Sequence, residues 1–217
     1  MMTVLADGLG VISVSAYGVR SKKSKTRVRL FSCCDFVLGK KSGDIYRMEQ
    51  MDLVDSFYPV CEDIEKLSLA NYLADLTRDA FETSDQNVLS LLLNTMYVIS
   101  YKDVACWLAK AAFEIKISQL MGYEPQIEEC IGCNCGGEMV AFDLSGGAKC
   151  KNCAKTGDII ISKGTFEAMS HILKNANIFS FSVSDTVRKE LSQIAEKYIL
   201  GKTERNYKSL EYLKKMM

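Results

Sequence analysis

The sequence predicts an α+β protein with a β-rich first part, a helical remainder and a cysteine-rich insertion within the helices. Three observations lead to this fold class. Short β-prone stretches with closely spaced turns occupy residues 9–57. Apolar residues then recur at helical spacing, and two Cys-x-x-Cys pairs interrupt that pattern. We therefore expect four segments: a β module, a first helical part, a cysteine module and a second helical part, at residues 1–57, 58–125, 126–157 and 158–217.

The β module is expected to be a small barrel or sandwich, because its strands are short and its turns close together. Residues 26–31 alternate, with Val28 and Leu30 on one face and Arg27 and Arg29 on the other. The remaining expected strands are an apolar run at residues 11–17, a hairpin of residues 36–38 and 45–48 that turns near Gly43, and a further strand at residues 50–57.

The helical parts are expected from their apolar spacing and from their end signals. The first helix, at residues 62–82, carries one apolar stripe formed by Leu69, Leu73, Leu76 and Ala80. Asp103 is a candidate N-cap for a helix that reaches residue 121 and is closed by Gly122, and Ser184 is a candidate N-cap for another. The expected helices after the first cover residues 85–100, 103–121, 165–175, 184–200 and 206–215.

The cysteine module (residues 126–157) has the spacing of a metal site. Cys130-x-x-Cys133 and Cys150-x-x-Cys153 are separated by sixteen residues, and each pair can aim two thiolates at one point. Four thiolates form a tetrahedral shell that suits Zn²⁺ and leaves no open position, so we expect a structural zinc ion. The turns of such a module are helped by its glycines, Gly132, Gly136, Gly137, Gly146 and Gly147.

The other cysteines need a separate explanation. Cys135 lies just beyond the first pair, and it is either a spare thiol or a competitor of Cys133 for the same ligand position. The remaining four are expected to be small buried apolar residues, namely Cys33, Cys34, Cys61 and Cys106.

The zero net charge hides a strong segregation of charge. Residues 20–41 contain eight basic residues and one acidic residue, whereas residues 42–85 contain three basic and eleven acidic residues. Cations interleaved with Ser and Thr suit a phosphate backbone, and a nearby aromatic ring can stack on a base. The candidate DNA-binding residues are those of the basic run (residues 20–29) with one aromatic neighbour: Arg20, Lys22, Lys23, Lys25, Arg27, Arg29 and Tyr17. The alternative is a solvated loop beside core aromatic residues. A second cationic surface is expected from Arg188, Lys189, Lys197 and Arg205.

Several function classes are disfavoured. No phosphate-binding Gly-rich loop, zinc-protease motif or nucleophile elbow is present in the sequence. The single histidine, His171, lies within a helical pattern and is expected to be structural. No apolar run approaches the roughly 18 residues of a membrane span, and no signal peptide is evident. We therefore expect a non-enzymatic cytoplasmic protein.

These features together resemble the bacterial RecO family of recombination mediators. The matching stretches are residues 5–25 with Arg29-Leu-Phe-Ser, then Gly122-Tyr-Glu-Pro leading into the two cysteine pairs, and the tail Tyr198-Ile-Leu-Gly with Lys208-Ser-Leu. The resemblance implies an N-terminal OB-fold, a helical domain and a zinc module. The resemblance implies functional roles only for residues that match the family's motifs. These are the four cysteines of the two pairs and four basic residues, namely Cys130, Cys133, Cys150, Cys153, Arg20, Lys22, Lys23 and Lys25.

The resemblance also implies a function. It implies binding of single- and double-stranded DNA, annealing of complementary strands, and, with RecR, loading of RecA onto strands coated by single-strand-binding protein, whose C-terminal tail docks on the helical domain. The protein would then be cytoplasmic and associated with the nucleoid. The competing hypothesis is a zinc-ribbon scaffold that binds protein and not DNA. A metal-dependent hydrolase is disfavoured because a four-thiolate site is closed.

The sequence departs from the family pattern at its N-terminal end. Family members have a strand and a turn before the position of Thr3, so this chain is expected to begin inside the second strand of the barrel. Such an incomplete barrel would leave an open sheet edge.

Overall fold

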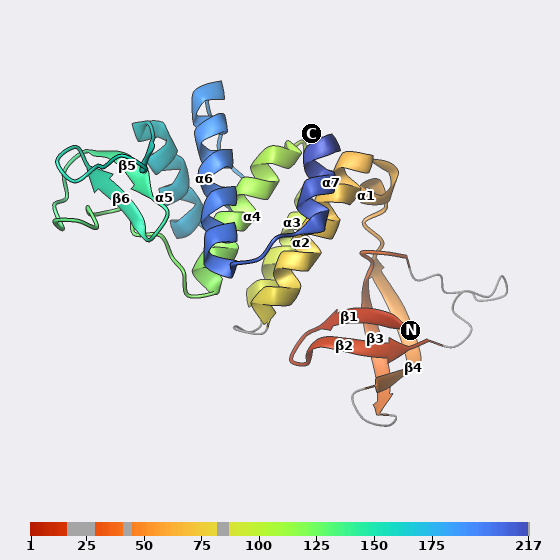
Figure 1. Cartoon of the computed structure of the whole chain (residues 1–217). Helices are drawn as coiled ribbons and strands as arrows, with labels where there is room; N and C mark the ends of the chain where they lie inside the picture. Colours follow the sequence, from red (N-terminus) through yellow and green to blue (C-terminus); the bar gives the residue numbers. More distant parts are fainter. Residues whose placement is uncertain (17–28, 41–44, 82–86, 217) are drawn as a thin grey trace. The chain divides into compact units, whose positions relative to one another are not determined.

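The computed structural model has the predicted α+β architecture, with a sheet followed by helices and a second small sheet (Figure 1). The structure describes residues 1–16, 29–40, 45–81 and 87–216. The chain divides into two compact units. The first unit contains Met1–Asp103 and Tyr212–Met216, and the second contains Val104–Glu211.

The first unit begins with a four-stranded sheet in the order β1-β2-β4-β3. Strand β1 (Met2–Ala6) pairs antiparallel with β2 (Gly10–Ser15), and β2 pairs parallel with β4. Strand β1 lies ahead of residues 11–17, where the apolar pattern predicts the first strand. Gly8, at a φ of 67°, allows the tight turn between the two strands. Among the described strands, β1 and β3 are the edges of the sheet.

The expected hairpin is confirmed by β3 (Cys33–Lys40) and β4 (Ile45–Asp55), which pair antiparallel. Its turn near Gly43 lies outside the described residues. Two expectations are corrected. The two strands expected at residues 45–48 and 50–57 are one continuous strand, β4. Its pairing with β3 shifts register between Val37 and Leu38, and this bulge does not interrupt the strand. Leu30 and Phe31, expected to end a strand, form a turn in which Phe31 has a φ of 62°.

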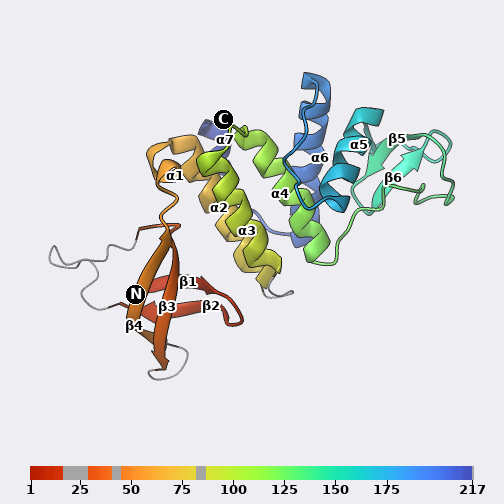
Figure 2. The same cartoon turned by 180° about the vertical axis from the view of Figure 1, so that it is seen from behind.

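Three helices complete the described part of the first unit before residue 103 (Figure 2): α1 (Tyr58–Glu62), α2 (Ile64–Phe81) and α3 (Asn87–Tyr101). The expected helix at residues 62–82 starts instead at Ile64, because the Asp63 carboxylate accepts hydrogen bonds from the amides of Glu65 and Lys66. The predicted apolar stripe of this helix is confirmed as core, since none of its four residues is exposed to solvent: Leu69, Leu73, Leu76 and Ala80.

Three helices form the centre of the second unit: α4 (Cys106–Leu120), α5 (Lys163–Lys174) and α6 (Asp185–Thr203). Helix α4 packs against both α5 and α6 (Figure 2), which is why it is buried on nearly all sides. Asp103 does not cap α4, because the chain stays extended through Ala105 and the helix begins one residue later. Gly122 closes the helix as predicted, with its amide bonded to the Gln119 carbonyl.

The last two helices lie close to their predicted positions. Ser184 caps α6 through its hydroxyl, which accepts a hydrogen bond from the Val187 amide at 3.4 Å. Helix α6 runs three residues beyond its expected end and stops at Glu204, which adopts the left-handed conformation. Helix α7 (Lys208–Met216) follows.

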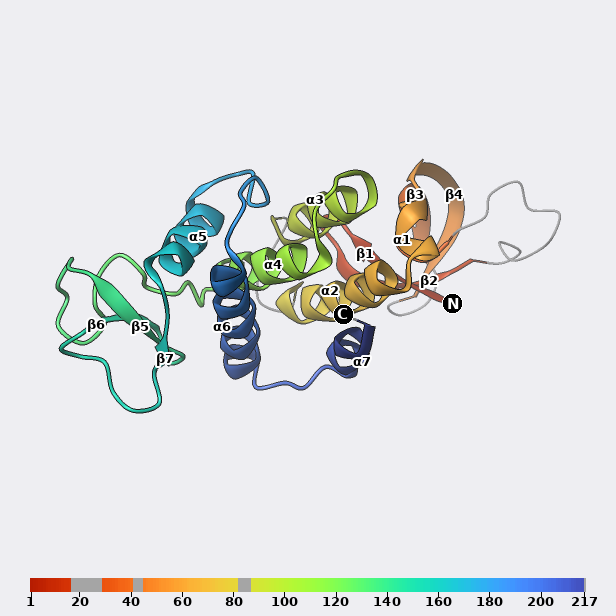
Figure 3. The same cartoon turned by 90° about the horizontal axis from the view of Figure 1, so that it is seen from above.

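The cysteine module contains a three-stranded sheet in the order β6-β5-β7, visible in Figure 3. Its strands are β5 (Met139–Asp143), β6 (Gly147–Cys150) and β7 (Ile159–Ile160). The module is anchored to the helices of its own unit at two points. Phe142 packs edge-on against Tyr198 of α6, with ring centroids 5.5 Å apart, and the Lys202 ammonium donates to the Ser145 carbonyl at 2.7 Å.

The lengths and hydropathies of the described helices bear on membrane spanning. None of them is both long enough and apolar enough to cross a membrane.

Candidate metal centre

The two predicted cysteine pairs converge in space. The sulfur atoms of Cys130, Cys133, Cys150 and Cys153 all lie within 4.8 Å of one another. The Cys133 and Cys150 sulfurs are 3.8 Å apart. Cys130 and Cys150 are buried, Cys153 is half-buried and Cys133 is exposed. Four sulfurs in one cluster are a donor set that can hold a metal ion.

Main-chain contacts shape the turns that present these sulfurs. The Cys130 amide donates to the Cys135 carbonyl at 3.0 Å, and the Asn134 amide donates to the Cys130 carbonyl at 2.8 Å, so the first turn is closed from both sides. Asn134 completes the turn in the left-handed conformation, with a φ of 55°.

Two glycines are required by close approaches in the module. A Cβ atom on Gly132 would lie 3.0 Å from the Cys153 sulfur, and one on Gly147 would lie 2.0 Å from the Gln126 carbonyl oxygen. The Gln126 segment can therefore bond to the hairpin, where the Ala148 amide donates to that carbonyl at 2.7 Å. Gly136 was expected to help a turn through its backbone freedom, but its φ is not positive and a Cβ atom there would meet nothing within 4 Å.

Backbone hydrogen bonds favour the thiolate form at the buried end of the cluster. The amides of Cys150 and Gly132 each donate to the Cys130 sulfur at 3.4 Å. These bonds, with the Cys150 amide contributing most, lower the pKa of Cys130 to about 6 against the opposing effect of burial. Because the thiolate is the form of cysteine that binds metals, Cys130 is prepared to act as a ligand near neutral pH.

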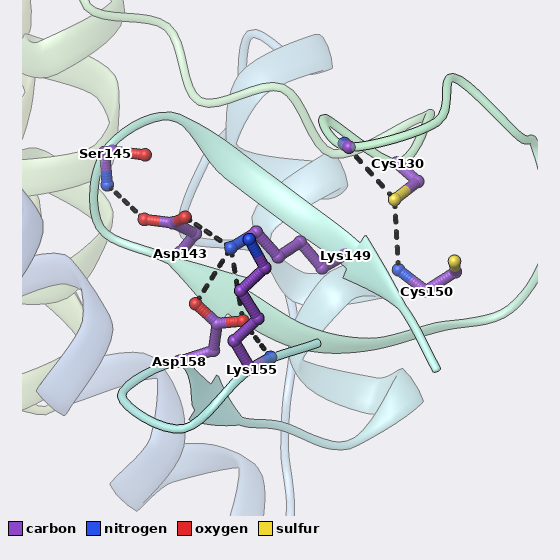
Figure 4. Close-up of polar contacts among 8 residues, drawn as sticks. Cys130, Asp143, Ser145, Lys149, Cys150, Lys155 and Asp158 are labelled. Atoms are coloured by element: carbon purple, nitrogen blue, oxygen red, sulfur yellow. Dashed lines mark hydrogen bonds and ion pairs between the residues drawn. The ribbon is translucent and has the colours of Figure 1, made fainter. Parts of the chain in front are cut away.

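A polar network holds the opposite end of the hairpin. The buried Lys149 ammonium lies between the carboxylates of Asp143 and Asp158, at 3.0 Å from an oxygen of Asp158 (Figure 4). The Lys155 amide donates to the second oxygen of Asp158 at 2.7 Å, and the Ser145 amide donates to Asp143 at 2.8 Å. The network therefore ties the turn of the hairpin, β6 and the segment before β7 together without a metal ion.

This network predicts a loss of stability in acid. Lys149, helped by the Ser145 amide, lowers the pKa of Asp143 from 3.8 to about 2. Because the pKa is lower in the folded state, the stabilisation is complete above the unfolded value and is lost as the pH falls from 3.8 toward 2. Unfolding by urea at pH 5 and at pH 2.5 should show that Asp143→Asn loses less stability over this interval than the unchanged protein. Asp185→Asn, on an exposed residue, is the control, and an equal loss in the unchanged protein and in Asp143→Asn would contradict the prediction.

Most candidate DNA-binding residues lie outside the described residues. These are Tyr17, Arg20, Lys22, Lys23, Lys25 and Arg27. Arg29 is described and exposed, and its guanidinium lies over the Tyr58 ring, 4.9 Å from the centroid. Arg29 is the last residue of the basic run, and a cation–π contact with Tyr58 holds its side chain against α1.

The second cationic surface is exposed on and after α6, as expected from its residues: Arg188, Lys189, Lys197 and Arg205. Arg188 lies over the ring of Trp107 at 5.4 Å. The structural interpretation of His171 is supported, because its ring bonds to the Asn177 carbonyl and to the Asn175 side chain near the end of α5. Cys106 is buried as expected, but the other three cysteines outside the module are only half-buried: Cys33, Cys34 and Cys61.

Sequence reasoning missed a buried ionic group in the second unit. The Lys110 ammonium on α4 contacts Glu114 at 2.8 Å and Glu196 of α6 at 2.9 Å. Glu114 has no exposed surface and Lys110 is 5 % exposed. The available signal in the sequence was a Lys and a Glu four residues apart in the mostly apolar first part of this helix.

A second missed contact lies at the start of α5. One carboxylate oxygen of Glu190 accepts hydrogen bonds from the amide and the hydroxyl of Ser162 and from the hydroxyl of Thr165. A residue of α6 thus stabilises the first turn of α5, and no local spacing could have indicated this contact.

Comparison with known proteins identifies the family. Residues 61–211 match the family model described as "Recombination protein O C terminal". A protein of Acetivibrio thermocellus named DNA repair protein RecO is 31% identical over 99% of this chain and 89% of its own length. Proteins of the same name from Clostridium perfringens and Alkaliphilus metalliredigens are 26% and 27% identical, over 98% and 92% of their own lengths. The family model and the near full-length similarity together show that the chain belongs to the RecO family.

Proposed function

We propose that this protein is a non-enzymatic mediator of DNA repair and recombination that acts in the cytoplasm at the nucleoid. The observation that carries the proposal is the similarity of almost the whole chain to proteins named DNA repair protein RecO. The protein would bind single- and double-stranded DNA and anneal complementary strands. With RecR it would help to load RecA onto strands coated by single-strand-binding protein, whose acidic C-terminal tail would dock on the helices.

Within this function, the β1–β4 sheet would be the core of an OB-fold, and the basic run would neutralise phosphates. Annealing would follow because neutralising the phosphates of two strands lowers their mutual repulsion and lets the bases pair. Arg29 supports this placement, since it is exposed and stands at the end of the run.

The cysteine cluster would hold a structural Zn²⁺ ion through Cys130, Cys133, Cys150 and Cys153. A tetrahedral shell with zinc–sulfur bonds of about 2.3 Å has sulfur–sulfur edges of about 3.8 Å. The Cys133–Cys150 sulfur distance of 3.8 Å fits that shell. Bound zinc would supply a cross-link between the two turns of the module and no chemistry on a substrate.

Charge reversal in the basic run tests the DNA-binding part of the proposal. We expect the triple variant Lys22→Glu/Lys23→Glu/Lys25→Glu to bind a labelled single strand roughly tenfold or more weakly at low salt, because three phosphate contacts are replaced by repulsion. The slope of log K against log salt should fall by about 2, since each contact with a single strand contributes about 0.7. Fluorescence anisotropy at several salt concentrations measures both quantities.

The matched control is Lys151→Glu/Lys163→Glu/Lys174→Glu, which makes the same charge change on exposed residues of the second unit. Equal weakening in both variants would show that net charge, and not the basic run, governs binding. Unchanged binding in the first variant would move the DNA site to the cations of α6. An absence of DNA binding by the unchanged protein would favour the alternative of a zinc-ribbon scaffold that binds protein only.

A further inference from the structure

Helix α3 exposes a face that carries no charge. None of its residues is acidic or basic, although a quarter of the whole chain is charged. The exposed residues of the helix recur at helical spacing, and they are Asn87, Ser90, Asn94, Tyr97 and Tyr101. Charged residues are depleted and tyrosine is enriched at the centres of binding surfaces. The composition of this face is therefore typical of a surface that contacts a partner.

Two tyrosines at the end of this face are held by contacts within the first unit. The ring centroids of Tyr97 and Tyr101 are 5.4 Å apart, and each residue is 45 % exposed. The Tyr101 hydroxyl donates to the Asp55 carboxylate at 2.6 Å, and the Tyr101 ring packs against the ring of the buried Phe57. Side chains that are already held lose little conformational entropy on binding, so the two rings are prepared to receive a flat ligand.

Cations accompany the exposed tyrosines of this region. The Lys102 ammonium lies over the Tyr97 ring, 5.6 Å from its centroid. Helix α1 packs against α3, and on α1 the Arg29 guanidinium lies over the exposed ring of Tyr58. Arg29 is also the last residue of the basic run. The run that we propose to bind phosphates therefore ends on the helix that packs beside α3.

Unpaired bases fit this surface better than a phosphate backbone or a charged peptide does. The centre of the surface is uncharged, whereas its rim carries both signs, with Lys102 and Arg29 against the carboxylates of Asp55 and the exposed Glu62. Bases are neutral and stack on exposed aromatic rings. In a duplex the bases are already stacked on one another and present only their edges in the grooves. The ligand that matches these features is single-stranded DNA.

We propose that Tyr97 and Tyr101 stack on unpaired bases and thereby favour single-stranded over duplex DNA. The proposal rests on the DNA-binding function proposed above. The basic run would contact the phosphates of either form, which accounts for binding but not for a preference. The two tyrosines would add affinity only for the form whose bases are accessible. They are therefore specificity-determining residues on the helical part of the first unit.

Anisotropy titrations with a labelled oligothymidylate and a labelled duplex test this role. Tyr97→Leu/Tyr101→Leu should bind the single strand roughly tenfold or more weakly, because two stacking surfaces are lost, while its affinity for the duplex stays the same. The slope of log K against log salt should not change, since no phosphate contact is removed. Tyr97→Phe/Tyr101→Phe keeps both rings and should bind as the unchanged protein does. The matched control is Tyr212→Leu, which removes an exposed tyrosine of α7 that also has a lysine over its ring.

The outcomes separate this role from DNA binding itself. Unchanged single-strand affinity in the leucine variant would mean that the tyrosines serve another partner. Equal weakening for the single strand and the duplex would contradict a preference for unpaired bases. Either result would overturn the inference while binding by the basic run stands. Weak binding by the phenylalanine variant would assign the effect to the hydroxyls and would also overturn the stacking role. An unchanged protein that binds no DNA would overturn both proposals.

A crosslinking measurement uses the unchanged protein. An oligothymidylate that carries iodouracil in place of some thymines is bound and irradiated, because this base crosslinks efficiently to aromatic rings on which it stacks. Mass spectrometry of the crosslinked peptides should locate the base on Tyr97 or Tyr101. Crosslinks confined to other residues would contradict the proposal even if the leucine variant fails to fold.

Discussion

Cys130→Ser is expected to abolish metal binding and to unfold the cysteine module. The Cys130 sulfur is fully buried and accepts two backbone hydrogen bonds, from Gly132 and Cys150. The apolar cluster around it is small, with Met139, Ala148 and the half-buried Phe166 as its main non-cysteine members. A module with so little apolar core would depend on the metal proposed for the cluster, since structural zinc contributes about 10–16 kcal/mol of binding free energy in small zinc-binding peptides.

The loss should be local and measurable. Elemental analysis should find less than about one tenth of the zinc of the unchanged protein, and amide exchange should become fast across residues 130–153 while α4 and α6 stay protected. Cys61→Ser is the control, because it removes a half-buried thiol that lies outside the cluster. Full zinc content and an unchanged melting temperature in Cys130→Ser would show that the cluster is not a metal site.

Lys110→Met should destabilise the second unit by about 3–5 kcal/mol, because it leaves a negative charge inside the helical core. Burial disfavours the Lys110 ammonium, but Glu114 and then Glu196 outweigh this effect and raise its pKa. Removal of the ammonium deprives the fully buried Glu114 carboxylate of its ion pair. Methionine nearly preserves the volume of the side chain, so the loss reports charge and not a cavity.

Urea unfolding at pH 7 measures this loss, and two variants control for it. Lys163→Met breaks an exposed ion pair of 3.7 Å with the same helical spacing and should cost at most about 0.5 kcal/mol. Adding Glu114→Leu to Lys110→Met removes the buried carboxylate as well and should recover much of the stability. A cost for Lys110→Met as small as that of Lys163→Met would mean that the group is solvated in the native protein.

The convergence of the four cysteines could be predicted because much of its information is local. Two sulfurs three residues apart on a tight turn must point in nearly the same direction, so the spacing alone indicates a paired ligand set. The same spacing could not decide whether Cys135 was spare or competing. Only the structure locates Cys135, which is half-buried against the cluster, with its carbonyl accepting a hydrogen bond from the Cys130 amide.

The helices were predictable for a similar reason, whereas strand order was not. The stripe that includes Leu69 and Leu73 is a property of one helix, and it became core as expected. The parallel pairing of β2 with β4 joins Ser13 to Ile45, and alternation within either strand carries no information about that partner. Asp103 failed as a cap because Asp residues are also common in turns, so its presence alone does not locate a helix start.

The sequence by itself determined the α+β class, the helical stripes and the convergence of four cysteines, since each of these follows from contacts between residues close along the chain. Tertiary structure alone decided three features. These are the pairing of β1 with β2, the burial of Lys110 against Glu196, and the capping of α5 by Glu190. Lys110 and Glu196 are 86 residues apart, so their contact exists only because α4 packs on α6. Packing of that kind depends on the free energy of the whole core, and no local pattern specifies it.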